Sequence, residues 1–257
     1  MRLSYSSISM FNKCPFNFYS RYIAKKYKYE EPTEPLKRGT AVHAIIEEYL
    51  APYKKGYVRD IKSKHDDNAI YDEETFYELA RPYIYSSIKF IKGADGVFIE
   101  LPLAIGKDEN ALDFFDKDAC LVGIGDLFVV KGDKAFYFDW KTGKGAYPDD
   151  LQLDIMSYLF LQSEEARQYN IKSVNSSLVY VEQNKTFPEN GYHIVNTGNL
   201  EDTKNRIYDN IEEIKDSVES GTFLSKKSPL CNYCNSMICP FSPHYDPLIE
   251  NENAKPR

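Results

Sequence analysis

The chain has 257 residues, of which 42% are hydrophobic and 28% charged, and its formal net charge is −7. These values are typical of a globular protein with a sizeable core, and they exclude a uniformly basic nucleic-acid binder. No stretch approaches the roughly 20 apolar residues of a membrane span, and no apolar leader opens the chain. We therefore expect a cytoplasmic protein that does not enter a membrane.

The negative charge is unevenly distributed along the chain. Residues 1–60 carry 11 Lys and Arg against 6 Asp and Glu, a local balance of +5, and the rest is acidic. The run Lys25-Lys26-Tyr27-Lys28 belongs to the basic part. It could line the path of a nucleic-acid backbone, or it could be an ordinary solvated surface.

The first segment predicts two short helices separated by a proline. Ser4, Ser6 and Ser7 are candidate N-caps for the first helix, and Cys14-Pro15 breaks the pattern before an aromatic second helix. Cys14 by itself would be a small buried hydrophobic residue.

A longer helix is predicted to begin at Gly39, after a linker over residues 32–35. His43 and Glu47 lie four residues apart on one face of this helix. Such a pair is either a surface pair or a metal-binding histidine supported by an acid. Residues 51–71 are expected to be polar and irregular.

Residues 121–141 predict a β-hairpin, with Gly132-Asp133 in its turn. Two acids, Asp126 and Asp139, occupy strand positions where apolar residues would be expected. Buried carboxylates at the end of a sheet are costly unless a cation compensates them, so this pattern favours a metal site.

Side chains alternate between the two faces of a strand, so Asp139 and Lys141 should share a face that Trp140 does not. An Asp-x-Lys triplet alone can equally be a plain ion pair. The remaining pattern predicts further helices and strands: helix 72–91 bent at Pro82, strand 97–105, helix 149–167, strands 174–182 and 192–196, and helix 199–218.

Cys231, Cys234 and Cys239 fall within nine residues, which indicates metal or cluster ligation rather than packing. The five cysteines are an odd number, and without an export signal thiols or ligands are favoured over disulfides. A fourth ligand could be His244, giving a site similar to a zinc knuckle. It could instead be Cys14, giving a four-thiolate site suited to a 4Fe-4S cluster.

Several of these features recur in a fixed order along the chain. The set resembles the PD-(D/E)XK nuclease superfamily, above all its RecB-like branch with an iron–sulfur site: the AddB nuclease domain, CRISPR-associated adaptation nucleases and phage exonucleases. The resemblance spans residues 3–240 and rests on these motifs: Leu3-Ser4-Tyr5-Ser6-Ser7 leading to Cys14-Pro15, Gly39-x3-His43, Gly125-Asp126, Asp139-x-Lys141, Gln152 and the terminal Cys-x2-Cys…Cys-Pro.

The resemblance implies an α/β, restriction-endonuclease-like fold, in which a central mixed sheet is flanked by helices and followed by a cysteine-ligated C-terminal subdomain. A single nuclease domain over 1–257 would comprise a helical N-terminal segment that contributes one cluster ligand, a core with a helical insertion, and the iron–sulfur subdomain. The expected bounds are 1–38, 39–220 with the insertion at about 51–96, and 221–245.

The resemblance also implies residue roles. Mg²⁺ or Mn²⁺ would be bound by His43, Asp126, Asp139 and the backbone carbonyl of Trp140. Lys141 would act with the two aspartates in catalysis by positioning or activating the attacking water. The cluster ligands would be Cys14, Cys231, Cys234 and Cys239.

Gln152 would contact DNA or orient Lys141. The family's tyrosine position, four residues after Gln152, is Met156 here, and the nearest tyrosine is Tyr158. Six residues rotate a helix by about 240°, so Tyr158 cannot simply replace the missing tyrosine in substrate binding.

The expected function is metal-dependent cleavage of DNA, most simply by an exonuclease acting on single-stranded ends or tails, with a structural 4Fe-4S cluster. Two alternatives remain. One is a non-catalytic nucleic-acid-binding module with a zinc knuckle. The other is a partner-dependent component of a recombination or CRISPR-adaptation complex that works with a helicase or recombinase.

Overall fold

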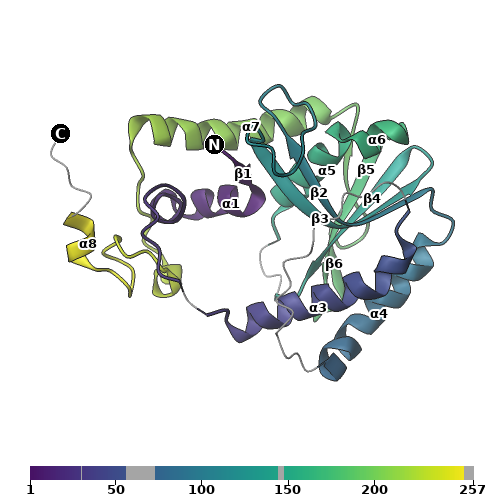
Figure 1. Ribbon diagram of the computed structural model, residues 1–257, viewed down its shortest axis with the longest axis horizontal. Coiled ribbons are helices and arrows are strands. Elements are labelled where there is room, and N and C mark those ends of the chain that lie inside the picture. The colour runs from purple at the N-terminus through teal and green to yellow at the C-terminus, as the bar shows by residue number, and fades with distance from the viewer. Residues whose placement is uncertain (30, 56–72, 144–147, 252–257) are drawn as a thin grey trace. The chain divides into compact units, whose positions relative to one another are not determined.

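The computed structural model describes residues 1–29, 31–55, 73–143 and 148–251 (Figure 1). Most of the stretch predicted to be irregular, and part of the predicted insertion, therefore lie outside the described residues. The chain divides into two compact units, one of Met1–Arg2 with Pro32–Asn205 and the other of Leu3–Glu31 with Arg206–Arg257. The expected boundaries after residues 38 and 220 stay predictions. Among the described residues, no helix is both long and apolar enough to cross a membrane.

A mixed sheet is the framework of the first unit, as predicted. Strands β2, β3 and β4 form an antiparallel meander, β4 pairs parallel with β5, and β5 pairs antiparallel with β6 and β7. The strands are β2 (Gly96–Ile105), β3 (Leu121–Lys131), β4 (Lys134–Lys141), β5 (Ser173–Tyr180), β6 (Lys185–Phe187) and β7 (His193–Asn196).

Helices cover both faces of this sheet (Figure 1). On one face lie α3 (Glu34–Leu50) and α4 (Glu73–Ile91), whose core residues pack with Leu127 and Val129 of β3. On the other lie α5 (Asp150–Gln162) and α6 (Glu164–Gln168). There the ring of Phe128 stacks between Tyr137 and Phe160, with centroid distances of 4.6 and 4.3 Å. Alternate residues of β3 thus serve two cores, which fixes the register of the strand.

Three details differ from the sequence prediction. The helix predicted over 149–167 is broken at Ser163, whose Oγ accepts a hydrogen bond from Ala166 N and begins a new helix. Helix α3 begins at Glu34 rather than Gly39, because a proline fits the first turn of a helix. The short strand β6 was not predicted, since three residues give too little pattern.

The second unit consists of residues 206–220 of a long helix, several short helical segments and irregular chain. Ser4 precedes α1, and its N–H donates to Ser7 Oγ at 2.9 Å. Pro15 starts α2 directly after Cys14, as the helix break predicts. The remaining elements of the chain are β1 (Leu3–Ser4), α1 (Tyr5–Lys13), α2 (Pro15–Phe18), a π-helical turn (Tyr19–Ile23), 3-10 helices at Ala51–Tyr53 and Pro229–Tyr233, α7 (Leu200–Ser220), which starts in the first unit, and α8 (Pro247–Asn251).

Candidate functional site

Three acids form one row across the sheet of the first unit. The register of β2 and β3 places Glu100 opposite Asp126, and the register of β3 and β4, continued by one residue, places Asp126 opposite Asp139. In the described strands neither ladder includes this row, so the strands separate there. Glu100 has a φ of 50°. That left-handed conformation is strained for a residue with a Cβ and is found preferentially at functional sites.

Asp126 is held where β3 and β4 separate. The N–H of Trp140, which no longer has a partner on β3, donates to Asp126 Oδ2 at 2.7 Å. The carbonyl oxygen of Trp140 lies 2.8 Å from His43 Nε2, and His43 Nδ1 lies 3.5 Å from Asp126 Oδ2. A side chain of α3, an acid of β3 and the backbone of β4 therefore meet at one point.

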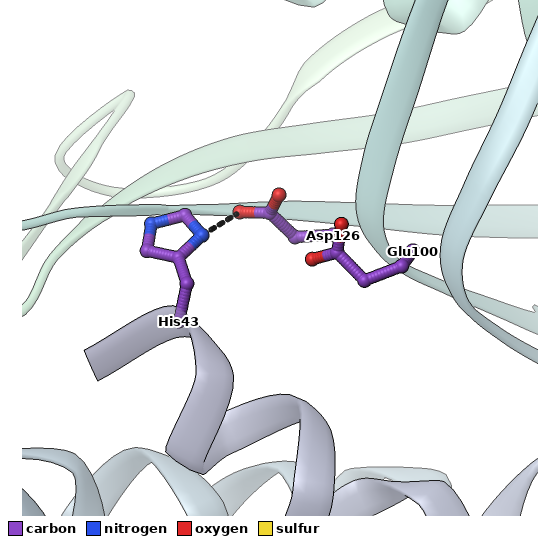
Figure 2. A group of neighbouring side chains, drawn as sticks. All are labelled: His43, Glu100 and Asp126. Carbon is purple, nitrogen blue, oxygen red and sulfur yellow. Dashed lines mark ion pairs between the residues drawn. The ribbon is translucent and has the colours of Figure 1, made fainter. Parts of the chain in front are cut away.

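Potential ligand atoms converge there. Within the described parts of the chain, one group of three His, Cys, Asp or Glu side chains has its ligand atoms within 4.8 Å of one another, and it consists of His43, Glu100 and Asp126 (Figure 2). Ligand oxygens around one Mg²⁺ lie about 3–4 Å apart, so small side-chain rotations would close this group on an ion. Glu100 was not among the site residues predicted from the sequence. The available signal was an acid inside an apolar strand, the same signal that marked Asp126.

Asp139 stands beside this group with different partners. Its Oδ2 lies 2.7 Å from Lys141 Nζ, which confirms that these two side chains share a face of β4. Its Oδ1 accepts hydrogen bonds from Gln152 Nε2 at 2.7 Å and from the hydroxyl of Tyr137 at 2.9 Å. Gln152 therefore contacts Asp139, and through it the lysine it was expected to orient. Asp139 is fixed by neighbours on three sides.

The electrostatics of the row indicate excess buried negative charge. Burial, with added repulsion from Asp126, Glu47 and Asp139, raises the pKa of Glu100 to about 8. Burial also raises the pKa of Asp126 to about 6, although His43 partly offsets the effect. Burial alone would lower the pKa of Lys141, but the charge of Asp139 outweighs it and the pKa is raised. A divalent cation is the natural complement of carboxylates that repel one another in this way.

Tyr158 lies apart from these residues. Its side chain has no exposed surface, and its hydroxyl donates to Glu109 Oε2 at 2.7 Å. Met156, at the position where the family has tyrosine, is also buried and packs close to Gly123 of β3. The structure thus brings Gln152 to the carboxylates but not Tyr158, whose contact with DNA stays a prediction.

The second unit contains a pocket of about 340 Å³ lined by four thiols. Cys14 comes from the junction of α1 and α2, Cys231 from the 3-10 helix Pro229–Tyr233, Cys234 from the residue after it, and Cys239 from the following loop. Residues more than 200 positions apart in the sequence thereby face one cavity.

Backbone groups already point at two of these sulfurs. The N–H of Lys226 donates to Cys14 Sγ and that of Ser228 to Cys231 Sγ, both at 3.4 Å. Burial, together with the neighbouring thiols, raises the pKa of Cys234 and Cys239. Thiolates gathered in this way are stabilised by N–H donors and by a cationic centre.

The distances between the thiol sulfurs distinguish a single zinc ion from a larger cluster. A tetrahedral zinc ion with four thiolates needs sulfur–sulfur distances of about 3.8 Å. Among the described cysteines, no three sulfurs lie mutually within 4.8 Å. His244, the alternative fourth ligand, has its Nδ1 3.3 Å from Lys28 Nζ. The fifth cysteine, Cys120, lies in the first unit, where its Sγ donates to the carbonyl of Ile105.

Comparison with models of protein families agrees with this geometry. A family model described as the PD-(D/E)XK nuclease superfamily matches residues 2–240. Among solved structures, the crystal structure of SSO0001 is similar, with 15% sequence identity and a TM-score of 0.34 over 80% of this chain and 96% of that chain. No curated protein matches. The family match and the group of His43, Glu100 and Asp126 support a metal-dependent nuclease. The chain belongs to the PD-(D/E)XK nuclease superfamily.

Proposed function

We propose that this chain is a Mg²⁺- or Mn²⁺-dependent deoxyribonuclease that removes nucleotides from single-stranded DNA ends or tails. The observation that carries this proposal is the convergence of His43, Glu100 and Asp126 beside the Asp139–Lys141 pair at one point of the sheet. We call these five residues the carboxylate site. Acids, an imidazole and an ammonium held in fixed positions suit phosphodiester hydrolysis, in which negative charge must be neutralised before an anion is attacked.

The metal ligands would be His43, Asp126, Asp139 and the carbonyl oxygen of Trp140, to which we add Glu100. A bound divalent cation would supply Lewis-acid polarisation of the phosphoryl oxygen and a lower pKa for a water molecule. His43 can turn its imidazole toward an ion, because the ring is held by one hydrogen bond of 2.8 Å to the carbonyl of Trp140 and one contact of 3.5 Å to Asp126, itself a proposed ligand. A site that mixes imidazole with carboxylates is expected to bind Mn²⁺ more tightly than Mg²⁺.

Lys141 has the role of holding positive charge next to the reacting phosphate. Its side chain is only about a third exposed, and the ammonium stays protonated because Asp139 raises its pKa. From that position it can orient a water molecule and stabilise charge that develops on the phosphate. Gln152 and Tyr137 fix the carboxylate of Asp139 and so fix the ammonium as well.

For the cysteine pocket, defined by Cys14, Cys231, Cys234 and Cys239, we propose a structural 4Fe-4S cluster. The cavity lined by all four thiols and the N–H donors directed at Cys14 and Cys231 support a polynuclear group over a single zinc ion. The cluster would join residue 14 to residues 231–239 and so stabilise the irregular chain that carries Cys231, Cys234 and Cys239.

The finer assignments rest on the resemblance to RecB- and AddB-like enzymes. They comprise exonucleolytic action, a role in recombination, repair or CRISPR adaptation, and cooperation with a helicase or recombinase. We expect the protein to act in the cytoplasm, where thiols and iron–sulfur clusters are protected from oxidation.

The test compares linear single-stranded DNA labelled at one end with a circular single strand of the same sequence, in Mn²⁺, in Mg²⁺ and in EDTA. We expect mononucleotides or short products from the linear strand but not from the circular one, and only when Mn²⁺ or Mg²⁺ is present. Loss of the linear and the circular strand at equal rates would make the enzyme an endonuclease. No cleavage in either metal, together with bound zinc, would favour the non-catalytic binding module.

A further inference from the structure

The second unit carries a concentration of positive charge that the carboxylate site does not use. Residues 13–29 and 221–245 together contain seven Lys and Arg and no Asp or Glu, in a chain whose net charge is −7. Both segments belong to the same unit. These two segments therefore form a local region of positive charge, which attracts polyanions, within a unit whose other charged residues are mainly acidic.

Backbone pairing brings the two basic segments together. The N–H of Lys28 donates to the carbonyl of Asn235 at 2.8 Å, and that of Met237 donates to the carbonyl of Lys26 at 3.0 Å. An antiparallel bridge joins Tyr27 to Ser236 between these bonds. Residues 26–28 are therefore fixed against residues 235–237.

Two tyrosines extend beyond the same end of this short ladder. Tyr29 follows one paired segment and Tyr233 precedes the other, and their side chains are 79% and 83% exposed. Large aromatic side chains lose favourable burial when they stand in water. Two exposed tyrosines close to several lysines are explained most simply by a ligand that covers the rings.

A cation already stacks on neighbouring rings of the same unit. The guanidinium of Arg21 lies 5.6 Å from the ring centre of Tyr22 and 5.3 Å from that of Tyr27. Arg21 and Tyr22 are both exposed, as are Lys25 and Lys28. Alternating rings and cations are the arrangement in which bases stack on aromatic faces while phosphates meet ammonium and guanidinium groups.

We propose that this exposed set of rings and cations binds single-stranded DNA as a surface separate in sequence and chemistry from the carboxylate site. We call it the aromatic–cationic surface, and it consists of Arg21, Tyr22, Lys25, Lys28, Tyr29 and Tyr233. The inference rests on the proposed function, since it names how a nuclease of single strands would hold its substrate. Duplex DNA fits less well, because paired bases are already stacked and cannot cover the tyrosine rings.

The test measures binding in EDTA, so that cleavage cannot occur, by fluorescence anisotropy of a labelled oligo-deoxythymidylate. Lys25→Ala with Lys28→Ala should weaken binding at low salt and reduce the slope of log affinity against log salt by roughly 0.7 per lysine. Tyr29→Ala with Tyr233→Ala should weaken binding about tenfold or more, whereas Tyr29→Phe with Tyr233→Phe should retain it, because stacking needs the ring and not the hydroxyl.

Matched variants in the first unit serve as controls. Lys92→Ala with Lys134→Ala removes two exposed lysines, and Tyr85→Ala with Phe115→Ala removes rings that are 63% and 65% exposed. The melting temperature and metal content of every variant show whether it is folded. The proposal is overturned if the second-unit variants bind single-stranded DNA as tightly as the parent, or if the control variants lose as much affinity as they do. It is also overturned if a duplex of the same length binds as tightly as the single strand.

Cleavage measured separately in Mn²⁺ keeps the two proposals distinguishable. A protein that cleaves nothing but shows the predicted binding losses would disprove the proposed function and leave the aromatic–cationic surface standing. A protein that cleaves single strands but whose affinity is unchanged by these substitutions would support the proposed function and disprove the aromatic–cationic surface.

Discussion

The carboxylate site and the cysteine pocket are built in opposite ways. Residues of the carboxylate site come from α3 and three neighbouring strands, and the ladders and packed cores beside the row of acids hold it in place. The cysteine pocket is lined in part by α1, but its four thiols come from a helix junction, a 3-10 turn and loops. The carboxylate site is held by the sheet before anything binds, whereas the distant segments around the cysteine pocket are joined by scattered hydrogen bonds, such as Phe16 N–H to Leu224 O and Lys226 N–H to Cys14 Sγ.

This difference indicates what each site contributes. The carboxylate site concentrates buried negative charge, which disfavours the metal-free fold but suits binding and catalysis once a cation is present. In the cysteine pocket a bound group would act as a cross-link, because it would join segments more than 200 residues apart. Substitutions in the carboxylate site should therefore lower the rate of DNA cleavage, and substitutions in the cysteine pocket should lower the free energy of unfolding.

The largest effect is expected from Lys141→Ala. Removal of the ammonium beside Asp139 should reduce turnover on single-stranded DNA by about 10²–10³-fold, since one positioned charge contributes on that scale. The matched control is Lys134→Ala, an exposed lysine at the opposite end of β4, which should cleave normally. Equal activity of Lys141→Ala and the parent, measured in Mn²⁺ with both proteins folded, would remove the lysine from the mechanism.

Cys14→Ser should act on stability instead. Loss of one ligand should abolish the brown colour and iron content, and it should lower the free energy of unfolding by about 2–5 kcal/mol, as for the loss of a native cross-link. Cys120→Ser, a cysteine of the first unit, should change neither. A colourless Cys14→Ser protein with an unchanged melting temperature would show that the pocket does not stabilise the fold.

Glu100→Gln should stabilise the metal-free protein, and more so at higher pH. The pKa of Glu100 is raised to about 8, so between its ordinary value and pH 8 the folded state binds more protons than the unfolded state. Stability of the parent in EDTA should therefore fall as pH rises through this range. Glutamine removes that dependence and should gain at least about 1 kcal/mol at pH 8, or roughly 2–4 °C. A thermal melt series that falls equally steeply in both proteins would contradict this assignment.

The smallest effect is expected from Tyr137→Phe. Its buried hydroxyl is one of two donors to Asp139 Oδ1, and Gln152 remains to hold the carboxylate. The loss of one such bond is worth about 1 kcal/mol, so kcat should fall about fivefold with little change in KM. Tyr169→Phe, in which the ring packs on Phe98, is the control. A change confined to KM would mean that Tyr137 acts on substrate binding rather than on Asp139.

Much of the carboxylate site could be predicted because it depends on local rules. The hairpin follows from its turn residues, and the shared face of Asp139 and Lys141 follows from strand alternation. Glu100 was missed because its position opposite Asp126 depends on the register of β2 and β3, which are joined by residues 106–120 rather than by a tight turn. Sequence spacing cannot fix that register.

The cysteine pocket shows a related limit. Spacing alone indicates that Cys231, Cys234 and Cys239 act together, but it cannot choose between Cys14 and His244 as the fourth member. That choice needs the tertiary contacts that place residues 14–16 beside residues 224–226. In the same way, the burial of Tyr158 depends on the packing of α5 against the sheet, and helical spacing showed only that it faces away from Gln152.

The most direct test of the account is a calorimetric titration of Mn²⁺ into protein freed of divalent metal, for the parent and three variants. Asp126→Asn should abolish binding, Glu100→Gln should weaken it by about 10–100-fold, and Asp95→Asn, an exposed acid of the first unit, should leave it unchanged. Equal Mn²⁺ affinity in all four proteins would contradict the claim that His43, Glu100 and Asp126 hold the catalytic metal.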